Sequence, residues 1–155
     1  MKDKIERFRV LLSQTTEIVE GPADKDEKLQ SVCQLLRDGV EYYKWVGFYV
    51  VDPLKSELIL GPFVGEPTEH VTIPFDSGIC GQAAQRRETF TVQDVSKEVN
   101  YLSCSPRVRS EIVVPLLKDA EIVAELDIDS HMVSPFGQED VDFLEHVCRM
   151  VSELY

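Results

Sequence analysis

Along the chain, the spacing of apolar residues changes from helical to strand-like and back, which limits the folds that it can adopt. Apolar residues follow a helical stripe from Ile5 to Val19, which Gly21-Pro22 ends, and a second stripe from about Asp24 to Tyr43. Short apolar or alternating segments then predict strands at residues 45–51, 57–60, 70–75, 89–92, 111–117 and 122–129.

Two further helices complete the pattern. Residues 79–86 favour a short helix, and Ser134-Pro135 predicts the start of the last helix, because proline at the first helical position is already in the required conformation. Residues 94–109 form a long polar connection. This order predicts an α+β fold: an antiparallel sheet with the N- and C-terminal helices packed on one face, and the short helix and loops over the other.

Length and charge narrow the possible functions. The chain has 155 residues, which suits one domain over residues 1–155 with a core that needs no metal or disulfide. The 28 acidic and 16 basic residues give a formal charge of -12, which argues against nucleic acid and anionic lipid as partners. The sequence has no signal peptide pattern and no membrane-length apolar run, so we expect a cytoplasmic protein.

Three acids stand where apolar residues are usual. Glu111 opens one predicted strand, and Asp127 and Asp129 lie two residues apart on the next, so that both point to the same side. A charge on a sheet face normally has a partner or a task. The other interpretation is that Asp127 and Asp129 face solvent on an edge strand, where charges block aggregation.

The four cysteines fall into two groups. Cys104 lies in the polar connection and Cys80 stands between glycines at the start of the short helix; an idle surface thiol and ordinary packing are the respective alternatives. Cys33 and Cys148 lie on apolar helical stripes, which indicates packing. The spacings match no zinc motif, and the three histidines are too scattered to bind a metal.

Five ordered motifs carry a resemblance to a known family. They are Trp45-Val46-Gly47-Phe48-Tyr49, Leu60-Gly61-Pro62-Phe63, Gly78-Ile79-Cys80-Gly81, Ser110-Glu111-Ile112-Val113-Val114-Pro115 and Leu126-Asp127-Ile128-Asp129-Ser130. Together they resemble the free methionine-R-sulfoxide reductases, which are single-domain GAF proteins. The resemblance implies a GAF-like fold, reduction of free methionine-R-sulfoxide without a cofactor, a thioredoxin-like reductant and a homodimer. It also places Cys104 on the catalytic cysteine and Cys80 on a second family cysteine.

The chain departs from the family pattern at three places. His70 stands where the commonest form has a third cysteine, so the chain resembles a two-cysteine subtype that resolves through Cys80. Around Cys104 the chain reads Tyr-Leu-Ser-Cys-Ser instead of the usual His-Ile-Ala-Cys-Asp. The usual glycine two residues before Leu126 is Ala124, and the acid Glu125 follows it.

The residue types suit such a reaction. A thiolate at Cys104 attacks the sulfoxide sulfur, and a neutral carboxyl protonates the leaving oxygen; Asp129 is the first choice for this acid and Glu111 the second. The acids that stay ionised, including Asp127, bind the α-ammonium of the free amino acid. Trp45 and Tyr49, on one side of a strand, form a wall for the sulfoxide side chain, although a tryptophan there is more often core.

Two other functions fit the same residues. The first is a GAF domain that senses a small molecule or redox state without turnover, since a fold does not imply an activity. The second is covalent attachment of a chromophore at Cys104, which three nearby acids disfavour because they would crowd a bulky anionic tetrapyrrole.

Overall fold

The structure is a computed structural model that describes residues 2–98, 101 and 106–155. Six strands form one antiparallel sheet in the order β3-β2-β1-β6-β5-β4. The elements, in chain order, are α1 (Lys2–Glu20), α2 (Lys25–Gly39), β1 (Trp45–Asp52), β2 (Glu57–Val64), β3 (Thr72–Pro74), α3 (Gly78–Arg86), β4 (Phe90–Val92), the 3-10 turn η1 (Val95–Lys97), β5 (Ser110–Lys118), β6 (Glu121–Ser130) and α4 (Gln138–Ser152).

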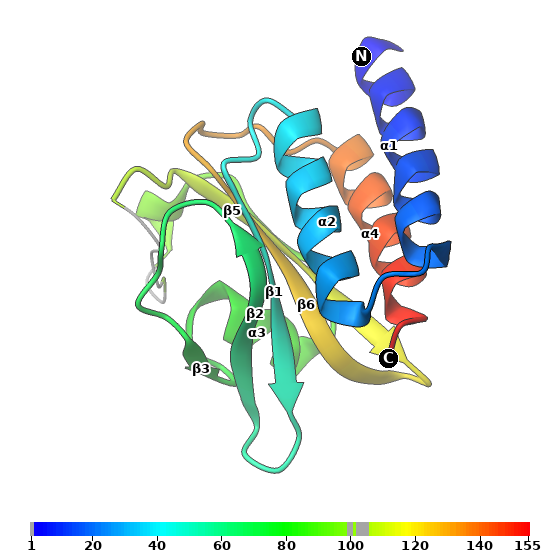
Figure 1. Ribbon diagram of the computed structural model, residues 1–155. Helices are drawn as coiled ribbons and strands as arrows, with labels where there is room; N and C mark the ends of the chain where they lie inside the picture. Colours follow the sequence, from blue (N-terminus) through cyan, green and yellow to red (C-terminus); the bar gives the residue numbers. More distant parts are fainter. Residues whose placement is uncertain (1, 99–100, 102–105) are drawn as a thin grey trace.

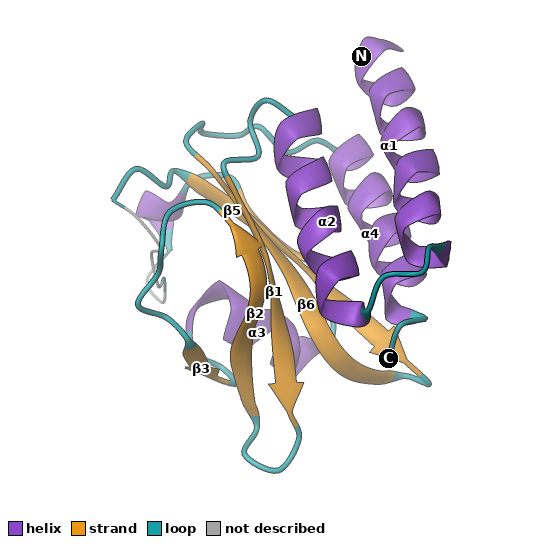
Figure 2. Ribbon diagram, viewed as in Figure 1, coloured by secondary structure: helices purple, strands orange, loops and turns teal. Residues whose placement is uncertain are grey.

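The helices divide between the two faces of the sheet. Helices α2 and α4 lie against one face and α1 packs across both of them, whereas the short α3 lies on the opposite face (Figures 1 and 2). The N- and C-terminal helices therefore share one face, and the expected α+β fold class is confirmed. None of the helices in the described ranges is both long and apolar enough to cross a membrane.

Strand β6 shows how the sequence separates the two faces. Ala124, Leu126 and Ile128 belong to the core beneath α2 and α4. The residues that alternate with them are Glu125, Asp127 and Asp129, all buried. Since side chains alternate along a strand, these acids point to the α3 side. A second apolar cluster from β1, β5 and α3 fills that side.

Helix α2 ends earlier than the apolar pattern predicts. Its last residue is Gly39 and its C-cap is Val40, whereas the stripe had indicated a helix to Tyr43. A side-chain carbon at Gly39 would lie 2.6 Å from the Leu11 side chain, so the glycine lets α1 approach closely. Tyr43 is buried because its ring packs into the core from the following turn, and not because the helix continues.

The prediction that Ser134-Pro135 begins the last helix is wrong. Helix α4 begins at Gln138, with Gly137 as its N-cap, and the Asp140 carboxylate accepts a hydrogen bond from the Gly137 amide at 2.9 Å. Ser134 has a positive φ of 57°, which an N-cap residue does not adopt. Between them, Phe136 enters the core and exchanges hydrogen bonds with the Gln93 side chain.

Asp140 ties the N-terminal helix to the C-terminal one. Its carboxylate is fully buried and accepts hydrogen bonds from the hydroxyls of Tyr42 at 2.6 Å and Tyr43 at 2.7 Å. The Lys4 ammonium of α1 lies 2.5 Å from the other carboxylate oxygen. A buried carboxylate with this many donors is well compensated for the loss of water.

Candidate active site

The three acids predicted from the sequence lie together in the middle of the sheet. Glu111 pairs with Asp129 across β5 and β6, and Asp127 is two residues along β6. Their exposed fractions are 3% for Glu111 and 1% for each aspartate. Strand β6 lies between β1 and β5, so the interpretation that these aspartates face solvent on an edge strand is wrong.

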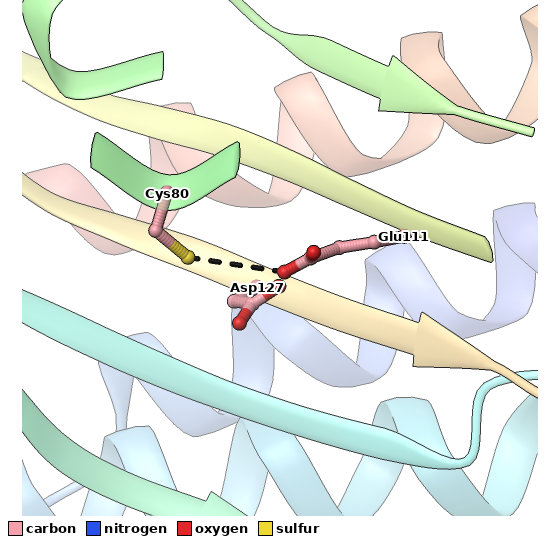
Figure 3. Close-up of side chains that lie close together, drawn as sticks. All are labelled: Cys80, Glu111 and Asp127. Atoms are coloured by element: carbon pink, nitrogen blue, oxygen red, sulfur yellow. Dashed lines mark hydrogen bonds between the residues drawn. The ribbon is translucent and has the colours of Figure 1, made fainter. Parts of the chain in front are cut away.

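Helix α3 brings Cys80 onto the acids. The Cys80 thiol donates a hydrogen bond to Glu111 Oε2, with a sulfur–oxygen distance of 3.9 Å, and Asp127 lies beside this pair (Figure 3). Donor atoms of Cys80, Glu111 and Asp127 all lie within 4.8 Å of one another, a set of sulfur and oxygen atoms that can bind a divalent metal.

Glycine is required for this approach of α3. A side-chain carbon at Gly81 would lie 2.6 Å from the Pro74 carbonyl oxygen on β3. Gly78, the first residue of the helix, has a φ of 65°, in the left-handed region that glycine adopts without strain. The Gly-Ile-Cys-Gly motif thus lets a helix sit close enough to the sheet for its thiol to contact the acids.

Burial favours the protonated forms of Cys80 and Asp127. Desolvation raises the pKa of the Cys80 thiol well above its usual value, and the charges of Asp127, Glu111 and Glu125 raise it further. Desolvation also raises the pKa of Asp127, although hydrogen bonds with Glu111 and Cys80 partly offset the effect. A thiol and a carboxyl that both hold their protons are suited to proton donation.

Glu125 is a fourth buried acid that the site assignment from sequence missed. It is fully buried, and neither carboxyl oxygen has a hydrogen-bond partner among the described residues. Desolvation raises its pKa well above the usual value, and the Asp127 charge adds to this. The sequence contained the signal, because Glu125 lies two residues before Asp127 and therefore points to the same side of the strand as Asp127 and Asp129.

An aromatic wall flanks the acids on β1. The Trp45 ring stacks on Tyr49 at a centroid distance of 6.3 Å and on Phe63 of β2 at 5.4 Å. Trp45 pairs with Asp129 and Tyr49 pairs with Glu125, so the wall stands next to the row of acids. Both aromatic residues are buried, and their polar groups donate to the Glu66 and His70 carbonyls at 2.9 and 2.8 Å.

The residue between the two aromatic side chains on this face has no side chain of its own. At Gly47, a side-chain carbon would collide with the Trp45 ring and come within 2.8 Å of the Phe63 Cβ. Glycine here leaves the space that the Trp45 ring occupies. The aromatic wall therefore requires glycine at position 47 as well as the aromatic rings.

A cavity of about 140 Å³ opens beside Asp129. Trp45, Asp129 and His131 line it, together with Arg107 and Glu66, which form an ion pair at 2.7 Å. Arg107 thus brings a positive charge to the cavity that Asp129 lines. Desolvation, with the charges of Arg107 and Lys44, lowers the pKa of the exposed His131, and the charge of Glu66 partly offsets this.

The remaining cysteines divide as follows. Cys104 lies outside the described residues, so its predicted role stays a prediction. Cys33 and Cys148 are buried in the helical core, where their thiols donate to the carbonyls of Pro62 and Val114. Desolvation raises the pKa of both thiols, as expected for packing cysteines.

Comparison with known proteins identifies the family. The GAF domain family matches residues 24–153. GAF domain-containing protein A of Dictyostelium discoideum is 34% identical, over 96% of this chain and 92% of that protein. The free methionine-R-sulfoxide reductase of Escherichia coli is 32% identical over 81% of this chain and 74% of its own. The structure of the Neisseria meningitidis free methionine-R-sulfoxide reductase with its substrate superposes with a TM-score of 0.90 at 34% identity, covering 95% of this chain and 87% of that one.

The fold on its own matches the GAF class, and the two named reductases refine that assignment. The chain therefore belongs to the GAF domain family, and within it to the group of the free methionine-R-sulfoxide reductases. This confirms the resemblance inferred from the five motifs.

Proposed function

We propose that this protein reduces free L-methionine-R-sulfoxide to L-methionine. The observation that carries the proposal is the buried group of carboxyls at Glu111, Asp127 and Asp129, next to an aromatic wall, in a chain similar to reductases with that substrate. The acids supply a proton and a negative charge, and the rings supply an apolar surface for the methylthio group.

The reaction starts at Cys104. Its thiolate attacks the sulfoxide sulfur while Asp129, or Glu111 as the second choice, protonates the departing oxygen. The protonated oxygen leaves as water while a bond forms between Cys104 Sγ and the substrate sulfur. Water then attacks Cys104 Sγ and breaks that bond, which releases methionine and leaves a Cys104 sulfenic acid. Because the pocket is buried, charge that develops on this oxygen is stabilised by the proton donor and not by bulk water.

Cys80 then resolves the sulfenic acid. The Cys80 sulfur forms a disulfide with Cys104 and the oxygen leaves as water; an external dithiol of the thioredoxin type reduces the disulfide and restores both thiols. The raised pKa of Cys80 means that its thiol must lose a proton as it attacks, and Glu111 already accepts a hydrogen bond from it. Glu111 is therefore placed to take that proton. The dithiol, the homodimer and the cytoplasmic location remain predictions.

Specificity for the free amino acid follows from charge. An α-ammonium binds the negative charge left on the acid cluster, whereas a methionine inside a peptide has no such ammonium. The burial of the cluster strengthens this discrimination because an ion pair there is screened less than at the surface.

The decisive experiment measures the reaction with each epimer. Purified protein is incubated with racemic free methionine sulfoxide and dithiothreitol, and the epimers and methionine are separated by chromatography. We expect only the R epimer to disappear, with an equal amount of methionine formed. Cys104→Ser should lose the activity, and Cys148→Ser, which changes a thiol buried in the helical core, is the matched control. Tight binding without methionine release would instead indicate a GAF sensor domain.

The disulfide step has its own test. After one equivalent of substrate, peptide mass spectrometry should find Cys80 linked to Cys104. Cys80→Ser should still release one equivalent of methionine but should lose recycling by thioredoxin, while small thiols still reduce the sulfenic acid. A link between Cys104 and Cys33, or a lasting sulfenic acid in the unaltered protein, would overturn this assignment.

A further inference from the structure

Cys80, Glu111 and Asp127 are arranged as the ligands of a metal ion would be. They come from α3, β5 and β6 and point toward one another (Figure 3). In a tetrahedral zinc site, with Zn–S of about 2.3 Å and Zn–O of about 2.1 Å, sulfur and oxygen lie about 3.6 Å apart. The Cys80 Sγ–Glu111 Oε2 distance is 3.9 Å, and all three donor atoms lie within 4.8 Å of one another. Only a small contraction would bring them onto one ion.

Glu125 independently indicates a missing ligand at this place. Both of its carboxyl oxygens are buried and have no hydrogen-bond partner among the described residues, as is also true of Asp127 Oδ1. Its side chain leaves β6 on the same side as Asp127, two residues earlier; the charge of Asp127 acts on it, and its own charge acts on Cys80. A buried carboxyl without a partner costs stability, which a bound cation would recover.

The donor types select the metal. A thiolate is a soft ligand that favours zinc-type ions, whereas Mg²⁺ and Ca²⁺ prefer oxygen ligands only. We propose that the reduced protein binds one zinc-type divalent cation, Zn²⁺ or Cd²⁺, through Cys80, Glu111 and Asp127, with Glu125 beside them. Three protein ligands leave the fourth position for water. The cation displaces the thiol proton of Cys80, so binding strengthens as the pH rises.

Such binding would regulate the site, and this consequence rests on the proposed function. The cation occupies carboxyls that otherwise bind the substrate ammonium, so it competes with substrate. It also holds the Cys80 sulfur, which then cannot form a disulfide with Cys104. Oxidation to the disulfide removes the thiolate ligand and excludes the metal. Metal-bound and disulfide states are therefore mutually exclusive.

Direct binding tests the proposal without any substrate. The reduced full-length protein, first freed of metal with a chelator, is titrated with Zn²⁺ in competition with a chromophoric chelator, and with Cd²⁺ while thiolate-to-metal absorption is recorded. We expect one ion per chain, a Cd²⁺–thiolate band, and no competition from Mg²⁺. Glu125→Gln should weaken Zn²⁺ binding by about 10- to 100-fold, the range for residues that support metal ligands.

Cysteine variants locate the site. Cys80→Ser should abolish the Cd²⁺–thiolate band, whereas Cys104→Ser and Cys148→Ser should keep it. A band that survives in Cys80→Ser, or one that disappears in Cys104→Ser, would overturn the proposal, as would failure of the unaltered protein to bind. Should circular dichroism show that Cys80→Ser is unfolded, Glu111→Gln takes its place, and unchanged Zn²⁺ affinity in that variant counts against the site.

The outcome is separable from the proposed enzymatic function. Metal binding with no methionine release would leave the cation site intact and refute the reductase. Methionine release without metal binding would support the reductase and refute the cation site.

Discussion

Replacing Glu125 with glutamine should make the stability of the protein less dependent on pH. Desolvation raises the folded-state pKa of this carboxyl well above its usual value. Between the unfolded pKa of about 4.3 and the higher folded pKa, the folded protein holds a proton that the unfolded chain has released. Stability from this group is thus fully present below the unfolded pKa and falls as the pH rises.

The size of the effect follows from linkage. Each pH unit between the two pKa values costs the folded state up to about 1.4 kcal/mol, so up to about 2.8 kcal/mol is lost between pH 5 and pH 7. Glutamine cannot ionise, so Glu125→Gln removes this loss. Glu125→Met also removes the unpartnered polar group, which should add about 1–3 kcal/mol to the free energy of unfolding at every pH.

Urea unfolding measured from pH 5 to pH 7 in the presence of a chelator tests this reasoning. The free energy of unfolding of Glu125→Gln minus that of the unaltered protein should increase with pH. Glu121→Gln, on the same strand but exposed, is the matched control and should change stability by roughly 0–1 kcal/mol without a trend. A difference for Glu125→Gln that stays constant across the range would refute the buried, protonated state of this carboxyl.

Three other measurements bear on the site and the fold. Asp129→Asn and Glu111→Gln should each lower methionine release by about 100-fold, from loss of a proton donor or charge, and unchanged kinetics in both would move the site elsewhere. N-acetylmethionine sulfoxide should be a poor substrate because it lacks the ammonium; reduction at the rate of the free amino acid would remove the charge argument. Asp140→Ala should cost about 3–5 kcal/mol in urea unfolding, since Lys4 and two tyrosine hydroxyls lose a buried partner. Glu139→Ala, at the partly exposed neighbour, should cost at most about 1 kcal/mol, and equal losses would contradict a special role for Asp140.

The spacing of apolar residues predicted helices and strands well where burial of one face alone determines that spacing. The stripe that ends at Gly21-Pro22 became α1, and the alternation through Asp127 and Asp129 became β6. The start of α4 was mispredicted because a different cap forms, two residues after Ser134-Pro135. Asp140 caps Gly137 from inside the helix, and Ser134 is fixed in a left-handed conformation while its amide donates to Gln93.

The acids of the site were predictable in position but not in number. The same-side placement of Asp127 and Asp129 follows from the strand period, and the pairing of Asp129 with Glu111 follows from the hairpin. Glu125 was noticed only as a departure from the family pattern. The strand period places Glu125 on the same side as Asp127, but its burial depends on α3 covering that face, which the period alone does not reveal.

The order of strands also has a consequence for synthesis. The apolar strand β1 lies between β2 and β6, and its partner β6 follows it by about seventy residues of chain. While the chain emerges from the ribosome, β1 can pair with β2, but its other edge stays open until residues 121–130 are available. An open apolar edge is a site for pairing with other chains. We therefore expect the nascent chain to be most prone to aggregation after β2 appears and before β6 emerges, and folding to be slow for its size because its central pairing is long-range.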